Sequence, residues 1–114
     1  MFNPNCVHWM NKLVKESEAS FILSSAWRMF GLETFNIHAA MQSLAQPAID
    51  QTPRLDGIRG QEIQSFLNKH KDVNKFVIID DDTDMGDLLP FLVRTDMEKG
   101  FMEEHYVKAL EMLK

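Results

Sequence analysis

Apolar residues follow two kinds of spacing along this chain, one typical of helices and one typical of short buried strands. Between Pro4 and about Ala19 the apolar positions recur every three or four residues, which predicts an amphipathic helix. Asn3 and Pro4 suit the N-cap and the first helical position of that helix. The apolar positions on its predicted buried face are Val7, Met10, Leu13 and Val14.

Three further helices are predicted by the same spacing, and four short apolar runs between them predict strands. A second helix is expected to end before Pro47, a third to begin at Arg59-Gly60, and a last one to follow Lys99-Gly100. The strand runs lie near residues 21 to 24, 48 to 52, 76 to 80 and 91 to 95. Strands that alternate with helices predict an α/β fold of three layers, Rossmann-like, with a mostly parallel sheet of about four strands.

The strongest predicted strand, Phe76 to Ile79, runs directly into a cluster of acids formed by Asp80, Asp81, Asp82 and Asp84. The carboxyl edge of a parallel sheet is where α/β proteins place their sites. Two carboxylates ~5 Å apart at an effective dielectric constant of ~20 repel by roughly 3 kcal/mol, so converging acids need protons, donors or a divalent cation. Mg²⁺ is the natural candidate. The alternative is that the acids only favour the N-terminal turn of the next helix.

Basic and hydroxyl side chains are predicted near the same edge. Ser24, Ser25 and Arg28 follow the strand near residue 21, and a hydroxyl with a guanidinium suits a phosphate. Arg59 opens a predicted helix, where backbone N–H groups favour an anion. The alternative reading makes the serines turn or cap residues and Arg28 a surface cation.

The other side chains with chemical potential favour structural roles. Arg94 lies in the last predicted strand and is expected to form a salt bridge. Cys6 is expected to be a small core residue. The histidines show no metal-ligand spacing and are expected at the surface; they are His8, His38, His70 and His105.

Composition narrows the class of protein. With 114 residues, 45% of them apolar and 25% charged, the chain is expected to form a single domain over 1–114. A formal charge of -5, with 12 scattered basic residues, argues against nonspecific nucleic-acid binding but leaves a nucleic-acid end as a substrate. One cysteine, no leader pattern and no apolar run near the ~20 residues that span a bilayer predict a cytoplasmic protein without a membrane segment.

Several sequence blocks, in this order and spacing, resemble the haloacid dehalogenase (HAD) superfamily, and more narrowly its small domains associated with RNA repair and phage proteins. The resemblance covers nearly the whole chain. The blocks are Phe2 to Val7, Phe21 to Arg28, Thr52-Pro53, Arg59 to Ile63, Phe76 to Met85 and Leu92 to Asp96.

The resemblance implies roles for individual residues. A hydroxyl after the second family strand binds the transferring phosphoryl group, which places Ser24 there, and a cation at a helix start neutralises it, which indicates Arg59. Paired acids after the fourth family strand hold Mg²⁺. These would be Asp80 and Asp81, with Asp84 or Asp82 in support. Trp27 and Arg28 would line the substrate side.

This sequence departs from the family pattern in one respect. The family places a central strand ending in Asp-x-Asp ahead of the helix that here begins at Pro4, and its first Asp attacks phosphorus. The sequence starts at Met1-Phe2, so that strand and the nucleophile are expected to be absent. We expect Mg²⁺ to bind weakly for the same reason.

The absent strand leaves two hypotheses for function. The first is a domain without its nucleophile, serving as a non-catalytic binding or interaction protein or as part of a split phosphatase. The second is a Mg²⁺-dependent phosphohydrolase acting on a nucleotide or polynucleotide phosphate end, with the Asp pair supplied from elsewhere. Exposed strand edges also predict a homodimer or a protein partner, unless the flanking strands pair directly or the fold is rearranged.

Overall fold

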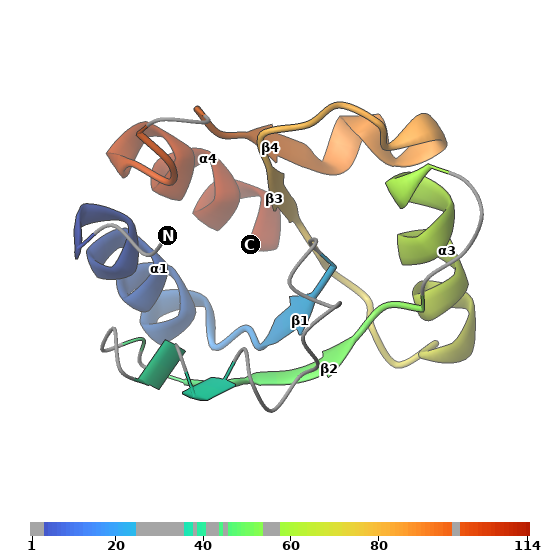
Figure 1. The fold of residues 1–114 in the computed structure, drawn as a ribbon, viewed down its shortest axis with the longest axis horizontal. Helices are drawn as coiled ribbons and strands as arrows, with labels where there is room; N and C mark the ends of the chain where they lie inside the picture. The colour runs from blue at the N-terminus through green and yellow to red at the C-terminus, as the bar shows by residue number, and fades with distance from the viewer. Residues whose placement is uncertain are drawn as a thin grey trace.

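The computed structural model describes residues 4–24, 36–37, 39–40, 44, 46–53, 58–96 and 99–114. Figure 1 shows the helices and strands in the order in which they alternate along the chain. In the part of the chain that is described, three helices of at least 11 residues are accompanied by four short strands and a 3₁₀ helix. Their bounds are α1 Pro4–Ser17, β1 Phe21–Leu23, β2 Ala48–Gln51, α3 Arg59–Lys69, β3 Ile78–Asp80, η2 Gly86–Phe91, β4 Leu92–Arg94 and α4 Glu103–Leu113.

The first and last helices, α1 and α4, pack against each other. Helix α1 buries the apolar face that its spacing predicts, including Val7, Leu13 and Val14. The Ser17 hydroxyl donates a 2.7 Å hydrogen bond to the Leu13 carbonyl, and Glu18 follows with a φ of 60°, which ends the helix two residues before the expected limit. Across the interface, the Tyr106 hydroxyl of α4 donates a hydrogen bond to the Glu16 carboxylate of α1.

The four described strands form two parallel pairs and not one continuous sheet. Strand β1 pairs with β2, and strand β3 pairs with β4. Backbone hydrogen bonds extend both pairs by one residue, from Thr52 N–H to the Leu23 carbonyl at 2.9 Å and from Thr95 N–H to the Asp80 carbonyl at 2.8 Å. The α/β class with parallel strands is therefore confirmed, whereas the single four-stranded sheet is not formed within the described residues.

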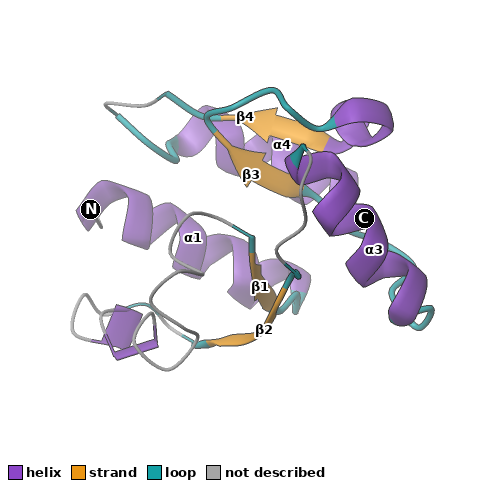
Figure 2. Cartoon of the chain, turned by 45° about the vertical axis from the view of Figure 1, so that its right-hand side comes forward, coloured by secondary structure: helices purple, strands orange, loops and turns teal. Residues whose placement is uncertain are grey.

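Figures 1 and 2 show how the pairs are arranged. In both views the strands follow the order β2, β1, β3, β4, so β1 and β3 are the inner strands. No pairing joins β1 to β3 among the described residues. Direct pairing of the two flanking strands, one of the three expected outcomes, is therefore not seen between the described strands.

Strand β3 contributes side chains to two apolar clusters. Ile79 packs against the cluster that α1 and α4 form with Val93. Ile78 belongs to the other cluster, with Ile63 of α3 and Met85. The strand therefore has apolar surroundings on both of its faces, which explains why its sequence reads as a continuous apolar run.

Two local features differ from the sequence prediction, and a third expectation is only partly covered by the described residues. The acid cluster leads into the 3₁₀ helix η2, which the spacing did not predict. Strand β3 begins at Ile78, two residues later than predicted, and ends at Asp80 as expected. Only residues 36–37 and 39–40 of the expected second helix are described as helical, and most of that helix lies outside the described residues.

Candidate functional site

The candidate site forms where the start of α3 meets the segment that follows β3. The N-cap position of α3, Ile58, provides no side-chain hydrogen bond. The Asp84 carboxylate takes over this role by accepting a 3.3 Å hydrogen bond from the Arg59 backbone N–H, while the Asp84 carbonyl accepts one of 3.0 Å from Gly60. An acid that follows β3 therefore caps a helix that precedes it in the chain.

Gly60 makes this close approach of two backbones possible. A Cβ atom at this position would lie 1.9 Å from the Met85 carbonyl oxygen, which is far inside any van der Waals contact. Only glycine leaves room for the backbone of Met85 against the first turn of α3. The Arg59-Gly60 dipeptide is a weak signal in the sequence, but the packing against Met85 requires glycine at position 60.

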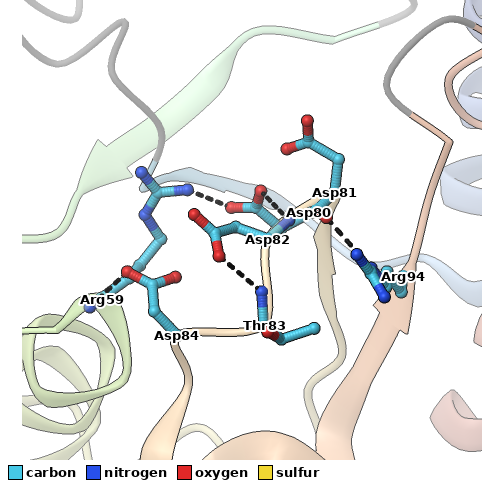
Figure 3. A network of polar contacts seen from close by, with 7 residues as sticks. All are labelled: Arg59, Asp80, Asp81, Asp82, Thr83, Asp84 and Arg94. Carbon is cyan, nitrogen blue, oxygen red and sulfur yellow. Dashed lines mark hydrogen bonds and ion pairs between the residues drawn. The ribbon is translucent and has the colours of Figure 1, made fainter.

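Arg59 and Asp80 form an ion pair at the centre of the site (Figure 3). The Arg59 side chain is 20% exposed and that of Asp80 is 8% exposed, so both charges are largely removed from water. Asp80 also accepts a 3.1 Å hydrogen bond from the Asp82 backbone N–H. A buried carboxylate with these partners is held in one orientation, and its charge is compensated.

The pKa values of the pair follow from these contacts. Burial would raise the pKa of Asp80, but contacts with Asp81, the Asp82 N–H and the Arg59 guanidinium together lower it below its usual value. Burial would likewise lower the pKa of Arg59, but Asp80 raises it above the ordinary value, with smaller contributions from Asp84 and Asp82. Both groups are therefore charged at neutral pH.

Asp81 contacts Asp80 of this pair through its side chain. No dashed contact joins its carboxylate to Arg59 in Figure 3. Contact with the Asp80 carboxylate raises the pKa of Asp81, with a smaller contribution from burial. Its backbone carbonyl accepts a 3.2 Å hydrogen bond from Arg94 Nε, and the expected salt bridge of Arg94 stays a prediction.

Three buried polar atoms of the described residues have no hydrogen-bond partner: Arg59 Nε, Asp84 Oδ1 and Gln51 Oε1. Two of them belong to the site, so one guanidinium donor and one carboxylate oxygen there are unsatisfied. Gln51 ends β2 and was not a predicted site residue. Its position at the carboxyl end of a predicted strand is the signal that could have indicated it.

The donor set meets the requirements of Mg²⁺ only in part. The Asp84 oxygen without a partner is a hard ligand of the kind that Mg²⁺ prefers, and three carboxylates around one guanidinium leave the site with excess negative charge. The described residues hold no group of three acids, histidines or cysteines arranged to bind a metal. They suit an ion that keeps several waters or a phosphate among its ligands.

The structure brings together some of the predicted site residues. Arg59, Asp80 and Asp84 are in direct contact, and Asp81 adjoins them. Ser24 follows β1, is partly buried and makes no hydrogen bond to Arg59 or Asp80. The expectation that Ser24 opens on the same edge as Asp80 therefore stays a prediction. Ser25, Trp27 and Arg28 lie outside the described residues.

The histidines and Cys6, which were expected to be structural, differ in how far they are buried and in what they contact. His8 is exposed as expected, and His38 lies outside the described residues. The expectation is wrong for His105, whose side chain is 13% exposed and accepts a 2.9 Å hydrogen bond from the Met102 N–H at the start of α4. His70 stacks on Phe66 with ring centroids 3.9 Å apart. Cys6 is partly buried and packs against the α1–α4 cluster.

Comparison with known proteins identifies the family. Residues 1–106 match the family described as the HAD domain in Swiss Army Knife RNA repair proteins. The chain therefore belongs to this family of HAD-like domains. No curated protein and no solved structure matches the chain significantly.

None of the helices in the described part of the chain is long and apolar enough to cross a membrane.

Proposed function

We propose that this domain binds the phosphorylated end of an RNA, with Arg59 neutralising the phosphate and Asp80 and Asp84 holding a weakly bound Mg²⁺ beside it. The observation that carries the proposal is the convergence of Arg59 with Asp80 and Asp84 from separate elements. The family's description as an RNA repair domain supports RNA as the substrate class. Ser24 at the end of β1 is proposed to contact the same phosphoryl group.

The charges of the site make phosphate binding dependent on a cation. Arg59 donates to Asp80 through one terminal nitrogen and its Nε is buried without a partner, so an incoming phosphate anion is proposed to bind its remaining terminal N–H groups. Asp80, Asp82 and Asp84 repel that anion, however. A divalent cation at the carboxylates would remove this repulsion and supply a positive charge to the phosphate, which is the chemistry Mg²⁺ contributes in phosphate sites.

The domain is proposed to bind the phosphate without cleaving it unless another segment supplies an attacking carboxylate. Asp80 pairs with Arg59 and Asp84 caps the start of α3, so we propose that both serve in binding and that neither is the nucleophile. By the family resemblance, the nucleophile belongs to a strand that would precede α1. This proposal makes the 114 residues a binding domain or one part of a split phosphatase.

Fluorescence anisotropy with short labelled RNAs tests the binding. We expect a 5′- or 3′-phosphorylated RNA to bind in the presence of Mg²⁺ and the hydroxyl-ended RNA to bind at least about tenfold more weakly, a difference of 1.4 kcal/mol. Arg59→Gln should abolish the preference for the phosphate. Arg94→Gln is the matched control, because Arg94 is exposed and bonded to a backbone carbonyl. Equal affinity for both RNAs would contradict the proposal.

Calorimetry with Mg²⁺ alone tests whether the protein offers the ion only a few ligands. Because the described residues offer fewer than three gathered ligands, we expect a dissociation constant well above about 1 μM. Sub-micromolar binding by the isolated chain would show that the site is more complete than proposed.

A further inference from the structure

His105 lies in the first turn of α4 with its ring largely buried, although its neighbours in that turn are exposed. The His105 side chain is 13% exposed, whereas Glu103 and Glu104 beside it face solvent. The His105 ring lies against that of Phe101, with ring centroids 6.0 Å apart. A side chain that titrates near neutral pH therefore lies within the junction where the chain enters α4.

The δ nitrogen of this ring caps α4. Met102 is the N-cap residue, and methionine is not among the residues whose side chains usually close the start of a helix. The Met102 backbone N–H donates a 2.9 Å hydrogen bond to His105 Nδ1. In a capping box this reach back to the N-cap N–H is usually made by glutamate or glutamine, so His105 takes the place of a residue that would keep its acceptor at neutral pH.

The hydrogen bond determines the protonation state of the ring. Nδ1 can accept only while it carries no proton, so the ring is neutral and its proton is on Nε2. Nε2 lies 3.9 Å from Glu104 Oε1, which is too far for a hydrogen bond. Glu104 is the charged group that forms an ion pair with this ring among the described residues, and its side chain is 82% exposed, so water screens its charge.

We propose that His105 is a proton-sensitive cap of α4, closed while the imidazole is neutral and released when the ring gains its second proton. A proton on Nδ1 would face the Met102 N–H, so that two donors would meet where a hydrogen bond is now made. A positive charge at the N-terminal end of a helix is also disfavoured by the helix dipole. This inference is independent of the proposed phosphate binding.

Release of the cap would reach the contact between α1 and α4. Phe101 and Tyr106 lie on either side of the capped turn and are buried, at 3% and 7% exposure. Both belong to the apolar cluster between the two helices, and the Tyr106 hydroxyl donates to Glu16 of α1. Opening of this turn would loosen both residues, so the cap links proton uptake to the packing of α4 on α1.

Amide hydrogen exchange of Met102, followed by NMR between pH 8 and pH 5.5, tests the cap. The protection factor, which divides out the intrinsic exchange rate, is compared in the wild type and in His105→Asn. The asparagine side-chain oxygen can accept a hydrogen bond in place of Nδ1 but does not titrate. His8→Asn removes an exposed histidine of α1 and is the matched control.

We expect the protection factor of Met102 to fall at least about tenfold from pH 8 to pH 5.5 in the wild type and in His8→Asn, because the hydrogen bond is lost. In His105→Asn it should change by less than about twofold over the same range. A constant protection factor in the wild type, or an equal fall in His105→Asn, would overturn the proposal.

The ¹⁵N chemical shifts of the His105 ring in the wild type provide a second measurement that needs no variant. At pH 8 they should show that Nδ1 carries no proton and that Nε2 carries one. A proton on Nδ1 at that pH would overturn the proposal as well.

Discussion

Arg59 and Asp80 are the residues on which the site depends most, because each compensates a charge that is largely buried. Removing one partner of such a pair leaves the other charge without compensation, and this costs more than the pair contributes. The pair therefore makes the site sensitive to single substitutions that would be harmless on an open surface.

Arg59→Gln should lower the free energy of unfolding by about 2 kcal/mol, since it removes a charge-assisted hydrogen bond to a buried carboxylate. Urea denaturation measures the change. The control Arg94→Gln removes an exposed guanidinium and should change stability by less than about 0.5 kcal/mol. Equal effects of the two substitutions would show that the Arg59–Asp80 pair contributes no more to the free energy of unfolding than an exposed arginine does.

Asp80 should make stability depend on pH in the acid range. The folded state lowers the pKa of this carboxyl, so its contribution is present above the unfolded value of about 4 and is lost as the pH falls through the lower folded value. We expect the stability difference between the wild type and Asp80→Asn to shrink from pH 6 to pH 2. Asp82→Asn is the exposed control. A difference that stays constant over this range would contradict the assignment.

Elements, more than single residues, decide how the site is assembled, and the contact of α3 with the segment after β3 is the critical one. Gly60→Ala should destabilise the protein by more than about 2 kcal/mol, because its Cβ would collide with the Met85 carbonyl oxygen and the backbone would have to move. Gln61→Ala, at an exposed position of the same helix, should leave stability nearly unchanged. Thermal unfolding of both variants measures this, and a tolerated alanine at position 60 would refute the close approach.

The contact between α1 and α4 should respond to alkaline pH. The hydrogen bond to Glu16 raises the pKa of Tyr106 to about 12. Its contribution is therefore complete below the unfolded value of about 10 and is lost as the pH rises towards 12. Tyr106→Phe should remove this part of the pH dependence in chemical denaturation. A variant that follows the wild type at every alkaline pH would show that the hydrogen bond does not stabilise the fold.

The sequence predicts the elements better than their assembly. Helical spacing located α1, α3 and α4, and continuous apolar runs located the strands, because these signals reflect burial of one face or of both. The 3₁₀ helix η2 carries no periodic signal. The capping of α3 by Asp84, 25 residues further along the chain, could not be read from local sequence, since it depends on tertiary packing.

The whole molecule is a HAD-family domain in which two parallel strand pairs remain separate among the described residues. We predict that the isolated chain shows no turnover of aryl phosphates, because Asp80 is paired with Arg59 and Asp84 caps the start of α3. Steady-state assays with Mg²⁺ measure this. Metal-dependent turnover that disappears in Asp80→Asn would show that the acids after Ile79 carry the chemistry themselves.

The site's proposed role rests on a divalent cation and a phosphate meeting at Arg59 and the aspartates, and paramagnetic NMR with Mn²⁺ in place of Mg²⁺ locates that meeting directly. Mn²⁺ accepts the same hard oxygen ligands and broadens the signals of nearby amides. We predict that broadening centres on Asp80 to Asp84 and on Arg59 and Gly60, and that inorganic phosphate increases it. Broadening centred on another acidic group, such as Glu103 and Glu104 at the start of α4, would contradict the account.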